Sequence, residues 1–216
     1  MWKEHKKTFI LTCIVMLLPI IAGVILWDKL PEQVPTHFDA KGEVNGWSSR
    51  GFAVFGMPLI LLGSQILMVF ITLADPKKKN LNGKLFTLIL WLMPMVSLFV
   101  HIATYTYALG YDISIMKGCE LFIGLVFLII GNYLPKCKQN YTLGYKLSWA
   151  LNDEDNWNKT HRLAGFLWVI GGAVIMLSAL WESQVIMIVV SVILFVVPVG
   201  YSFLHFLRHG QNKENE

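Results

Sequence analysis

Polar and charged residues divide this chain into long apolar runs separated by short hydrophilic stretches. The apolar runs span residues 8–27, 51–74, 85–111, 121–135, 163–181 and 183–207. A helix that crosses the hydrocarbon core of a bilayer needs about 20 mainly apolar residues, with roughly 17 as the lower limit. Five of the runs meet that limit, and the fourth does so when residues 118–120 are added. The pattern therefore predicts six transmembrane helices.

The architecture that fits these runs is a bundle of helices. Backbone groups in lipid must be hydrogen-bonded internally, and the runs are too continuous for the alternating strands of a barrel. Only Glu182 and its immediate neighbours separate the last two runs, which predicts a tight helical hairpin. The first run is preceded by Lys3, Lys6 and Lys7, just as basic residues precede the apolar part of a secretory signal. It is longer than the apolar part of a signal and lacks a cleavage site of small residues, so we expect a retained helix.

Composition supports a membrane protein. The chain is 55% hydrophobic and only 15% charged, whereas soluble domains are about 25% charged. The net charge of +4 is modest, and it does not predict direct binding to nucleic acid. Membrane lipids are the expected surroundings and partners of most of the surface.

The distribution of Lys and Arg predicts the orientation. Fourteen of the 18 lie at the N-terminus, in the second loop, in the fourth loop or in the C-terminal tail. Positive residues favour the cytoplasmic side, so both termini are predicted to lie in the cytoplasm. The predicted fold class is therefore an all-α integral membrane protein, a six-helix bundle of N-in/C-in orientation.

The first external loop, residues 28–50, is predicted to be structured. Pro31 and Pro35 favour extended backbone, while Gly42 and the pair Asn45-Gly46 predict turns, the latter of the hairpin type. Trp47 is expected at headgroup level. Two interpretations stay open for this loop: a hairpin that merely joins two helices, or a ligand-facing outer surface.

The fourth loop, residues 136–162, is dense in polar and aromatic residues. Asn152 to Asp155 predict a helix cap with acidic residues in the first turn. That helix would run through Trp157 directly into the fifth span. Trp149 and Trp157 are expected to anchor the loop at the membrane surface. The short basic second loop, with Lys77 to Lys79, is expected to fix the topology.

Few groups in the sequence could perform chemistry. The intramembrane ionisable candidates are Glu120, His101 and His205, and we expect Glu120 and His205 to reach water at the ends of their spans. His37, Asp39 and Glu43 form a weak candidate metal site. The chain lacks the HExxH, GxSxG, Walker A and dinucleotide-binding motifs. We therefore predict no enzyme, with no catalytic residue, no cofactor and no bound metal. The three cysteines are expected to be free thiols.

Two segments resemble signatures of a known family. The first is LPEQVPTHFDAKGEVNGW, and the second is GNYLPKCKQNYTLGYKLSWALNDEDNWNKTHRLAG. Together they are similar to the SdpI family of bacterial membrane proteins, which is associated with immunity to a secreted antimicrobial peptide. The resemblance extends from about residue 30 to residue 172. It implies a multi-pass protein of the bacterial plasma membrane that protects the producing cell from a peptide toxin. It also implies signalling, in which a cytoplasmic transcriptional repressor is held at the membrane.

The resemblance assigns candidate roles to individual residues of this chain. The external toxin-contact candidates are Pro31, Pro35, His37, Phe38, Gly42, Gly46 and Trp47. The cytoplasmic motif candidates are Gly131, Asn132, Asn140, Gly144, Lys146, Trp149, Trp157, Thr160 and His161. Lys146 departs from the family pattern, which has an arginine there, and a lysine lacks the planar fork that grips a carboxylate or phosphate.

The predicted organisation has two parts. Residues 1–84 form an N-terminal helical hairpin with the structured external loop and the basic cytoplasmic loop, and residues 85–216 form a four-helix region with the polar fourth loop. Two other functions remain as alternatives: a channel or transporter of small solutes, and a membrane-embedded metal-dependent enzyme.

Overall fold

The computed structural model describes the backbone of residues 2–213 and the side chains of residues 2–208. Its helices are α1 (Trp2–Ile25), α2 (Met57–Ala74), α3 (Gly83–Ala108), α4 (Ile115–Tyr133), α5 (Ser148–Leu151), α6 (Glu154–Ser178) and α7 (Gln184–Lys213). Shorter helical segments are η1 (Phe52–Gly56), η2 (Lys78–Asn80) and η3 (Leu134–Lys136), and the strands are β1 (Gln33–Phe38) and β2 (Val44–Ser49). Among the described residues, six helices are long and apolar enough to cross a membrane, which confirms the six predicted spans and the all-α multi-pass fold class.

The chain forms two compact units. Unit 1 contains the residues up to 73 together with 82–118, and unit 2 contains residues 74–81 and 119–216. The third span thus belongs with the first two by its contacts with α1, whereas residues 74–81, which precede it, pack within unit 2. The organisation predicted from the sequence, with a boundary at residue 84, stays a prediction.

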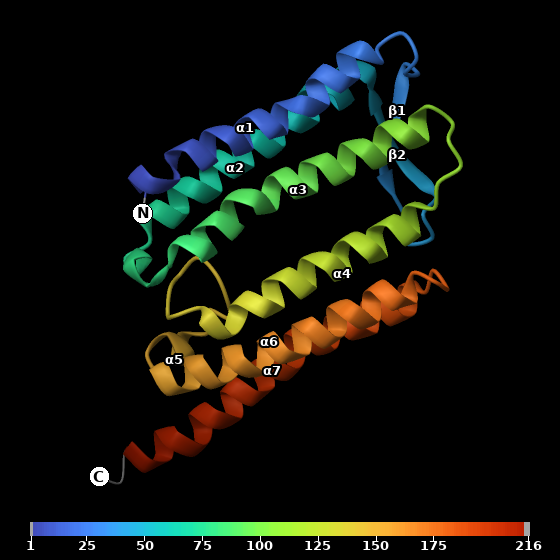
Figure 1. Cartoon of the computed structure of the whole chain (residues 1–216). Coiled ribbons are helices and arrows are strands. Elements are labelled where there is room, and N and C mark those ends of the chain that lie inside the picture. The colour runs from blue at the N-terminus through green and yellow to red at the C-terminus, as the bar shows by residue number, and fades with distance from the viewer. Residues whose placement is uncertain (1, 214–216) are drawn as a thin grey trace. The chain divides into compact units, whose positions relative to one another are not determined.

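In unit 1, helices α1, α2 and α3 lie side by side, with the two strands at one end of them (Figure 1). Pro94 lies inside α3 and has no N–H to give to the carbonyl of Leu90. The buried side chain of Gln65, from α2, donates to that carbonyl at 2.8 Å. A freed backbone acceptor in lipid is costly, so this bond stabilises the interrupted helix.

The first loop, residues 28–50, forms an antiparallel β-hairpin, as expected, but its turn differs from the predicted one. The strands pair His37 with Gly46 and Pro35 with Trp47. The chain reverses between Asp39 and Glu43, where Asp39 Oδ1 accepts from two backbone N–H groups and Gly42 has a φ of +80°. The prediction of a turn at Asn45-Gly46 was wrong, because both residues lie within β2.

In unit 2, helices α4 and α6 approach closely through glycines. A Cβ placed on Gly124 would lie 2.6 Å from the carbonyl oxygen of Gly172, and one placed on Gly131 would lie 3.1 Å from that of Gly165. The contacts pair positions seven residues apart on each helix in antiparallel order. Small residues at such spacing allow backbones in membranes to pack closely. We call this contact the glycine seam.

Helix α6 also packs along α7 after a short connection, which confirms the predicted helical hairpin of the last two spans. The connection includes Glu182, whose φ is +50°. Large apolar side chains cover the outer surface of the helices; those of α7 include Val185, Ile188, Val189, Val192, Ile193 and Val196. An apolar surface of this extent is typical of a helix that faces lipid.

Candidate functional site

The polar segment before α6 folds back onto α6 and α7. We call residues 137–153 the docked loop. It is held at its start by Trp157, whose indole N–H donates to the carbonyl of Cys137 at 2.7 Å. Helix α6 begins where predicted, because the side chain of Asp153 accepts from the N–H of Asn156 at 3.0 Å. This cap confirms the predicted helix start.

His161 connects the docked loop to α6. Its Nδ1 lies 2.8 Å from the carbonyl oxygen of Trp157, and its Nε2 lies 3.0 Å from the backbone nitrogen of Tyr145. A carbonyl only accepts and an amide N–H only donates, so Nδ1 carries the proton and Nε2 accepts. The ring is buried and stacks on that of Trp157 at a centroid distance of 4.0 Å. His161 is therefore held as a neutral imidazole of one tautomer.

Gly144 lets the loop reach His161. Its φ of +107° favours glycine, and a Cβ at this position would overlap the His161 ring. The next residue, Tyr145, supplies the N–H that His161 accepts. The glycine is thus required both by the backbone conformation and by the close approach of the imidazole.

Asn140 shapes the first turn of the docked loop. Its Oδ1 accepts from the backbone N–H groups of Thr142 and Leu143 at 2.8 and 2.6 Å, and its Nδ2 donates to the carbonyl of Lys138 at 2.8 Å. The same Nδ2 lies 3.1 Å from the sulfur of Cys137. Burial raises the pKa of the Cys137 thiol to about 11. Asn140 therefore performs a structural task, and Cys137 is an unreactive buried thiol at neutral pH.

Asp75 anchors the docked loop from the second loop, a role that the sequence pattern did not predict. Its Oδ2 accepts from the backbone N–H of Tyr141 and the hydroxyl of Thr142, each at 2.8 Å. The Nζ of Lys77 donates to the carbonyl of Leu151 at 2.9 Å. The second loop thus holds the docked loop in place. The sequence did hold a signal for this role. Asp75 is the only acidic residue between the second and third spans, and it lies directly before Pro76 and three lysines.

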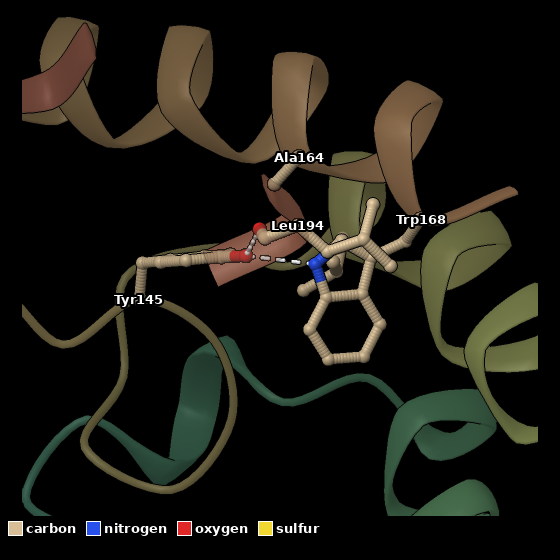
Figure 2. Close-up of a cluster of buried hydrophobic side chains, with 5 residues drawn as sticks. Tyr145, Ala164, Trp168 and Leu194 are labelled. Atoms are coloured by element: carbon tan, nitrogen blue, oxygen red, sulfur yellow. Dashed lines mark hydrogen bonds between the residues drawn. The ribbon is translucent and has the colours of Figure 1, made fainter. Parts of the chain in front are cut away.

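Tyr145 fills a gap in the hydrogen bonding of α7. Pro198 lies inside α7 and leaves the carbonyl of Leu194 without its helical donor. The hydroxyl of Tyr145 donates to that carbonyl at 2.6 Å and accepts from the indole N–H of Trp168 at 2.7 Å, as Figure 2 shows. Burial raises the pKa of the Tyr145 hydroxyl to about 12. Its proton therefore stays in place for donation at physiological pH.

A second polar cluster ties the docked loop to α7 at Ser202, about two turns beyond Leu194. The indole N–H of Trp149 donates to the hydroxyl of Ser202 at 3.0 Å, and that hydroxyl donates to Asn156 Oδ1 at 2.6 Å. Asn156 also donates to the carbonyl of Ser202 at 2.9 Å and accepts from the Thr160 hydroxyl at 3.0 Å. Every polar group in this buried cluster has a partner, which makes it a rigid connection.

The tryptophan prediction for this loop needs correction. Trp157 is fully buried, and its polar edge is bound to the loop backbone. It is therefore a packing residue of the docked loop, and the predicted anchoring at the membrane surface was wrong for it. Of the other motif candidates, Gly131 lies in the glycine seam, whereas Asn132 and Lys146 are exposed.

The structure separates the hairpin candidates into two groups. Pro35 is buried, Gly42 makes the turn, and Gly46 leaves room for the Cβ of His37, which lies 2.7 Å from where a glycine Cβ would be. Phe38 packs edge-on against Tyr107 at a centroid distance of 5.1 Å. These residues build the hairpin.

The remaining hairpin candidates are exposed. Trp47 has 57% of its surface accessible, His37 is exposed and its Nδ1 bonds the side chain of Asn45, and Pro31 is exposed at the entry to β1. His37, Asp39 and Glu43 do not converge, and no group of three possible metal-binding side chains occurs among the described residues.

The ionisable candidates within the spans are more buried than expected. Glu120 is fully buried and His101 is 2% exposed, while His205 is 8% exposed and lies 3.1 Å from Asp155 across the α6–α7 contact. The expectation that Glu120 and His205 reach water was therefore wrong, because neighbouring helices cover both side chains. They lie on three different helices: Glu120 on α4, His101 on α3 and His205 on α7.

Comparison with known proteins finds similar sequences over most of the chain. Residues 136–202 match the SdpI/YfhL protein family, and residues 14–62 match a domain of unknown function, DUF1648. The chain is 24% identical over 193 residues to the immunity protein SdpI of Bacillus subtilis, covering 89% of this chain and 91% of that protein. No solved structure matches.

The family match begins at Lys136, directly before the docked loop, and ends at Ser202, so it covers the segment that the hydrogen bonds join into one module. The predicted resemblance to the SdpI family is therefore confirmed, through this C-terminal module and through the similarity to the Bacillus subtilis protein along most of the chain.

Proposed function

We propose that this protein is a membrane immunity protein, which protects the cell that makes it from a secreted antimicrobial peptide. The observation that carries the proposal is the match to an immunity protein over 89% of the chain, together with the family match over the docked loop, α6 and α7. The multi-pass fold agrees with a toxin that acts on membranes. The membrane is the plasma membrane of a bacterium, and both termini lie in the cytoplasm.

The hairpin is the surface that meets the toxin. Its strands fix His37 and Trp47 in place while both side chains remain exposed. A prearranged aromatic side chain binds a partner with a small ordering cost, and exposed Trp residues often dominate binding energy. Phe38, which packs inside unit 1, supports the hairpin instead of contacting the toxin.

The docked loop is the cytoplasmic surface that passes the toxin signal to a repressor. We call this surface the output face. Lys138 and Lys146 are exposed on a segment whose backbone is held rigidly by Asn140, Asp75 and His161. A rigid basic surface on the cytoplasmic side can retain a repressor protein at the membrane while toxin is present. Membrane lipids with anionic headgroups contact the same charges.

The immunity proposal is tested by deleting the gene from the source organism and exposing the cells to their own spent medium. We expect the deletion to sensitise the cells, and expression of the native protein to restore growth. A deletion strain that grows as well as its parent would overturn the proposal.

The hairpin proposal is tested in the complemented strain. We expect His37→Ala and Trp47→Ala to lower the tolerated toxin dose, with membrane levels matched. Trp181→Ala is the matched control, since Trp181 is also an exposed tryptophan, 72% accessible, but lies outside the hairpin. Unchanged protection by both hairpin variants would remove this surface from the proposal. The output face is tested by sedimenting the membranes with and without toxin. We expect the repressor to co-sediment with the membranes only when toxin is present.

A further inference from the structure

A pocket lies between α1 and α3 in unit 1. Its volume is about 120 Å³, and its walls are almost entirely apolar. Two of the side chains that line it, Leu18 and Ile102, are 45% and 64% exposed, so the pocket is open to the lipid around the helices. On α1 it is lined by Leu18, Pro19 and Ala22, and on α3 by residues that include His101, Ile102 and Tyr105.

His101 brings a polar edge to this apolar pocket. Its Nδ1 lies 2.7 Å from the carbonyl oxygen of Ser97, and a carbonyl only accepts, so Nδ1 carries the proton. Because Nδ1 is turned back toward its own helix, Nε2 lies at the far edge of the ring. Nε2 is buried and has no hydrogen-bond partner among the described residues. Neither nitrogen contacts a carboxylate there, so the neutral ring is favoured at membrane depth, and Nε2 is an acceptor.

The neighbouring hydroxyl groups do not supply the missing bond. The ring of Tyr105 lies edge-on to the imidazole at a centroid distance of 5.7 Å, but its O–H donates to the carbonyl of Pro19 at 3.1 Å. The Ser97 hydroxyl, one turn before His101, also has no partner in the described part of the chain. A buried acceptor without a donor is costly. The pocket therefore favours a ligand that brings one donor.

The depth of the pocket limits where that donor comes from. His101 lies seven residues before Ala108, the end of α3, which is about 10 Å along the helix. The 26 residues of α3 extend about 39 Å, whereas the hydrocarbon core is about 30 Å thick. His101 thus lies inside the hydrocarbon region. The hydroxyl groups of lipid heads lie outside that region, and acyl chains carry no donor.

The size of the pocket fits one aromatic ring. An apolar protein cavity of about 150 Å³ stays dry and binds benzene. A pocket of about 120 Å³ that is open on one side accommodates the same ring. Phenol adds a single O–H donor to it. A water molecule also donates but leaves the apolar walls unfilled, and an indole is larger by a second ring.

From these observations we propose that the pocket binds the phenol side chain of a tyrosine that a peptide carries into the membrane. The ring lies against the apolar walls, and its hydroxyl donates to His101 Nε2. The identity of the peptide rests on the proposed function, in which it is the toxin. The position of the pocket agrees with that function, because Phe38 of the hairpin packs against Tyr107 at the same end of α3, within unit 1.

Phenol itself tests the pocket without any toxin. The full chain, with isotopically labelled histidine nitrogens, is placed in nanodiscs of phosphatidylcholine and phosphatidylglycerol and observed by nitrogen NMR. We expect phenol to move the Nε2 resonance of His101 saturably, and His101→Leu to identify that resonance by its loss. Anisole, which has the ring but no donor, should bind about tenfold more weakly, the ratio that one hydrogen bond supplies.

Three results would overturn the phenol assignment. The first is the absence of a saturable shift, or equal binding of phenol and anisole. The second is a native resonance that is already at the bonded position before phenol is added, which would identify water as the occupant. The third is tighter binding of indole than of phenol, which would exclude tyrosine in favour of tryptophan.

Filling the pocket provides an independent test. We expect Ala22→Leu to abolish the phenol response while the protein stays folded. Ala103→Leu is the matched control, since Ala103 is half-buried on α3 but does not line the pocket. Ile102→Trp, at the exposed opening, blocks entry if Ala22→Leu does not fold. Equal phenol responses in the blocked variant and in Ala103→Leu would contradict binding in this pocket.

The same variants separate this proposal from immunity itself. In the complemented strain we expect Ala22→Leu to tolerate several-fold less spent medium than Ala103→Leu, at equal membrane levels. Equal tolerance would overturn the toxin as the source of the tyrosine, while the deletion strain still reports on immunity. If phenol binds but the deletion strain is not sensitive, the proposed function fails and the toxin fails with it, whereas the ligand chemistry of the pocket stands.

Discussion

His161 accepts a hydrogen bond from the backbone N–H of Tyr145, with 3.0 Å between the two nitrogens. The imidazole thereby acts as part of the backbone network of the docked loop. A histidine that follows a cluster of acidic residues could be taken for an acid–base group. Here both ring nitrogens are already used, which leaves neither free for a substrate.

Replacing Gly144 should separate the docked loop from α6. We expect Gly144→Ala to destabilise the protein by on the order of 3 kcal/mol, because strained backbone and steric overlap each cost about 1–3 kcal/mol. The measurement is the thermal unfolding midpoint in detergent. Gly110→Ala is the matched control, since Gly110 has a φ of +82° but nothing lies near its Cβ position. Equal losses in the two variants would show that the His161 contact is unimportant.

Tyr145 and Pro198 should be coupled in a double-mutant cycle. Tyr145→Phe leaves the Leu194 carbonyl without a donor, which costs about 1–3 kcal/mol. Pro198→Ala supplies a helical N–H to the same carbonyl, so the Tyr145→Phe change should cost less in that background. Pro94→Ala, in α3, should give no such relief. Additive effects of Tyr145→Phe and Pro198→Ala would contradict the role assigned to the hydroxyl.

Asp75 should control the accessibility of the docked loop. We expect Asp75→Ala to release Tyr141 and Thr142 and to speed tryptic cleavage at Lys138 and Lys146, read by gel and mass spectrometry. Asp112→Ala is the control, because Asp112 lies in the exposed connection between α3 and α4. If cleavage rates are the same in native protein and Asp75→Ala, the carboxylate does not hold the loop.

Cys137 should make stability depend on pH in the alkaline range. The thiol pKa is about 11 in the folded chain and 9.0 in the unfolded reference, so the unfolded state loses its proton first. The contribution of Cys137 to the free energy of unfolding is complete below pH 9.0. It falls by roughly 1.4 kcal/mol per pH unit as the pH rises toward 11. Unfolding at several pH values, compared between native protein and Cys137→Ala, measures this slope. The variant should lack this part of the decline, and a decline of equal size in both would refute the assignment.

The spans could be read from the sequence because lipid imposes a length on every helix that crosses it. The cap at Asp153 and the existence of the hairpin were also predictable, since both depend on neighbouring residues. The hairpin turn was misplaced because Asn45-Gly46 matches a two-residue turn, whereas Asp39 organises a longer one through its side chain.

Sequence patterns could not predict the contacts between distant segments of the chain. The hydrogen bond from Tyr141 to Asp75 joins residues 66 positions apart, and the bond from Gln65 to Leu90 joins two different helices. The burial of Trp157 follows from such contacts, while hydropathy alone favours a place at the membrane surface. The glycines of α4 and α6 were visible individually, but their pairing depends on the register of the two helices.

The link between Tyr145 and Leu194, 49 residues later, bears on how the protein is made. Ribosomes deliver Tyr145 and α6 first, whereas α7, which carries the Leu194 carbonyl, leaves the ribosome later. Until that helix enters the bilayer, the loop has no acceptor for its phenol. A chain truncated ahead of α7 should therefore insert its earlier spans yet expose this loop to cellular quality control.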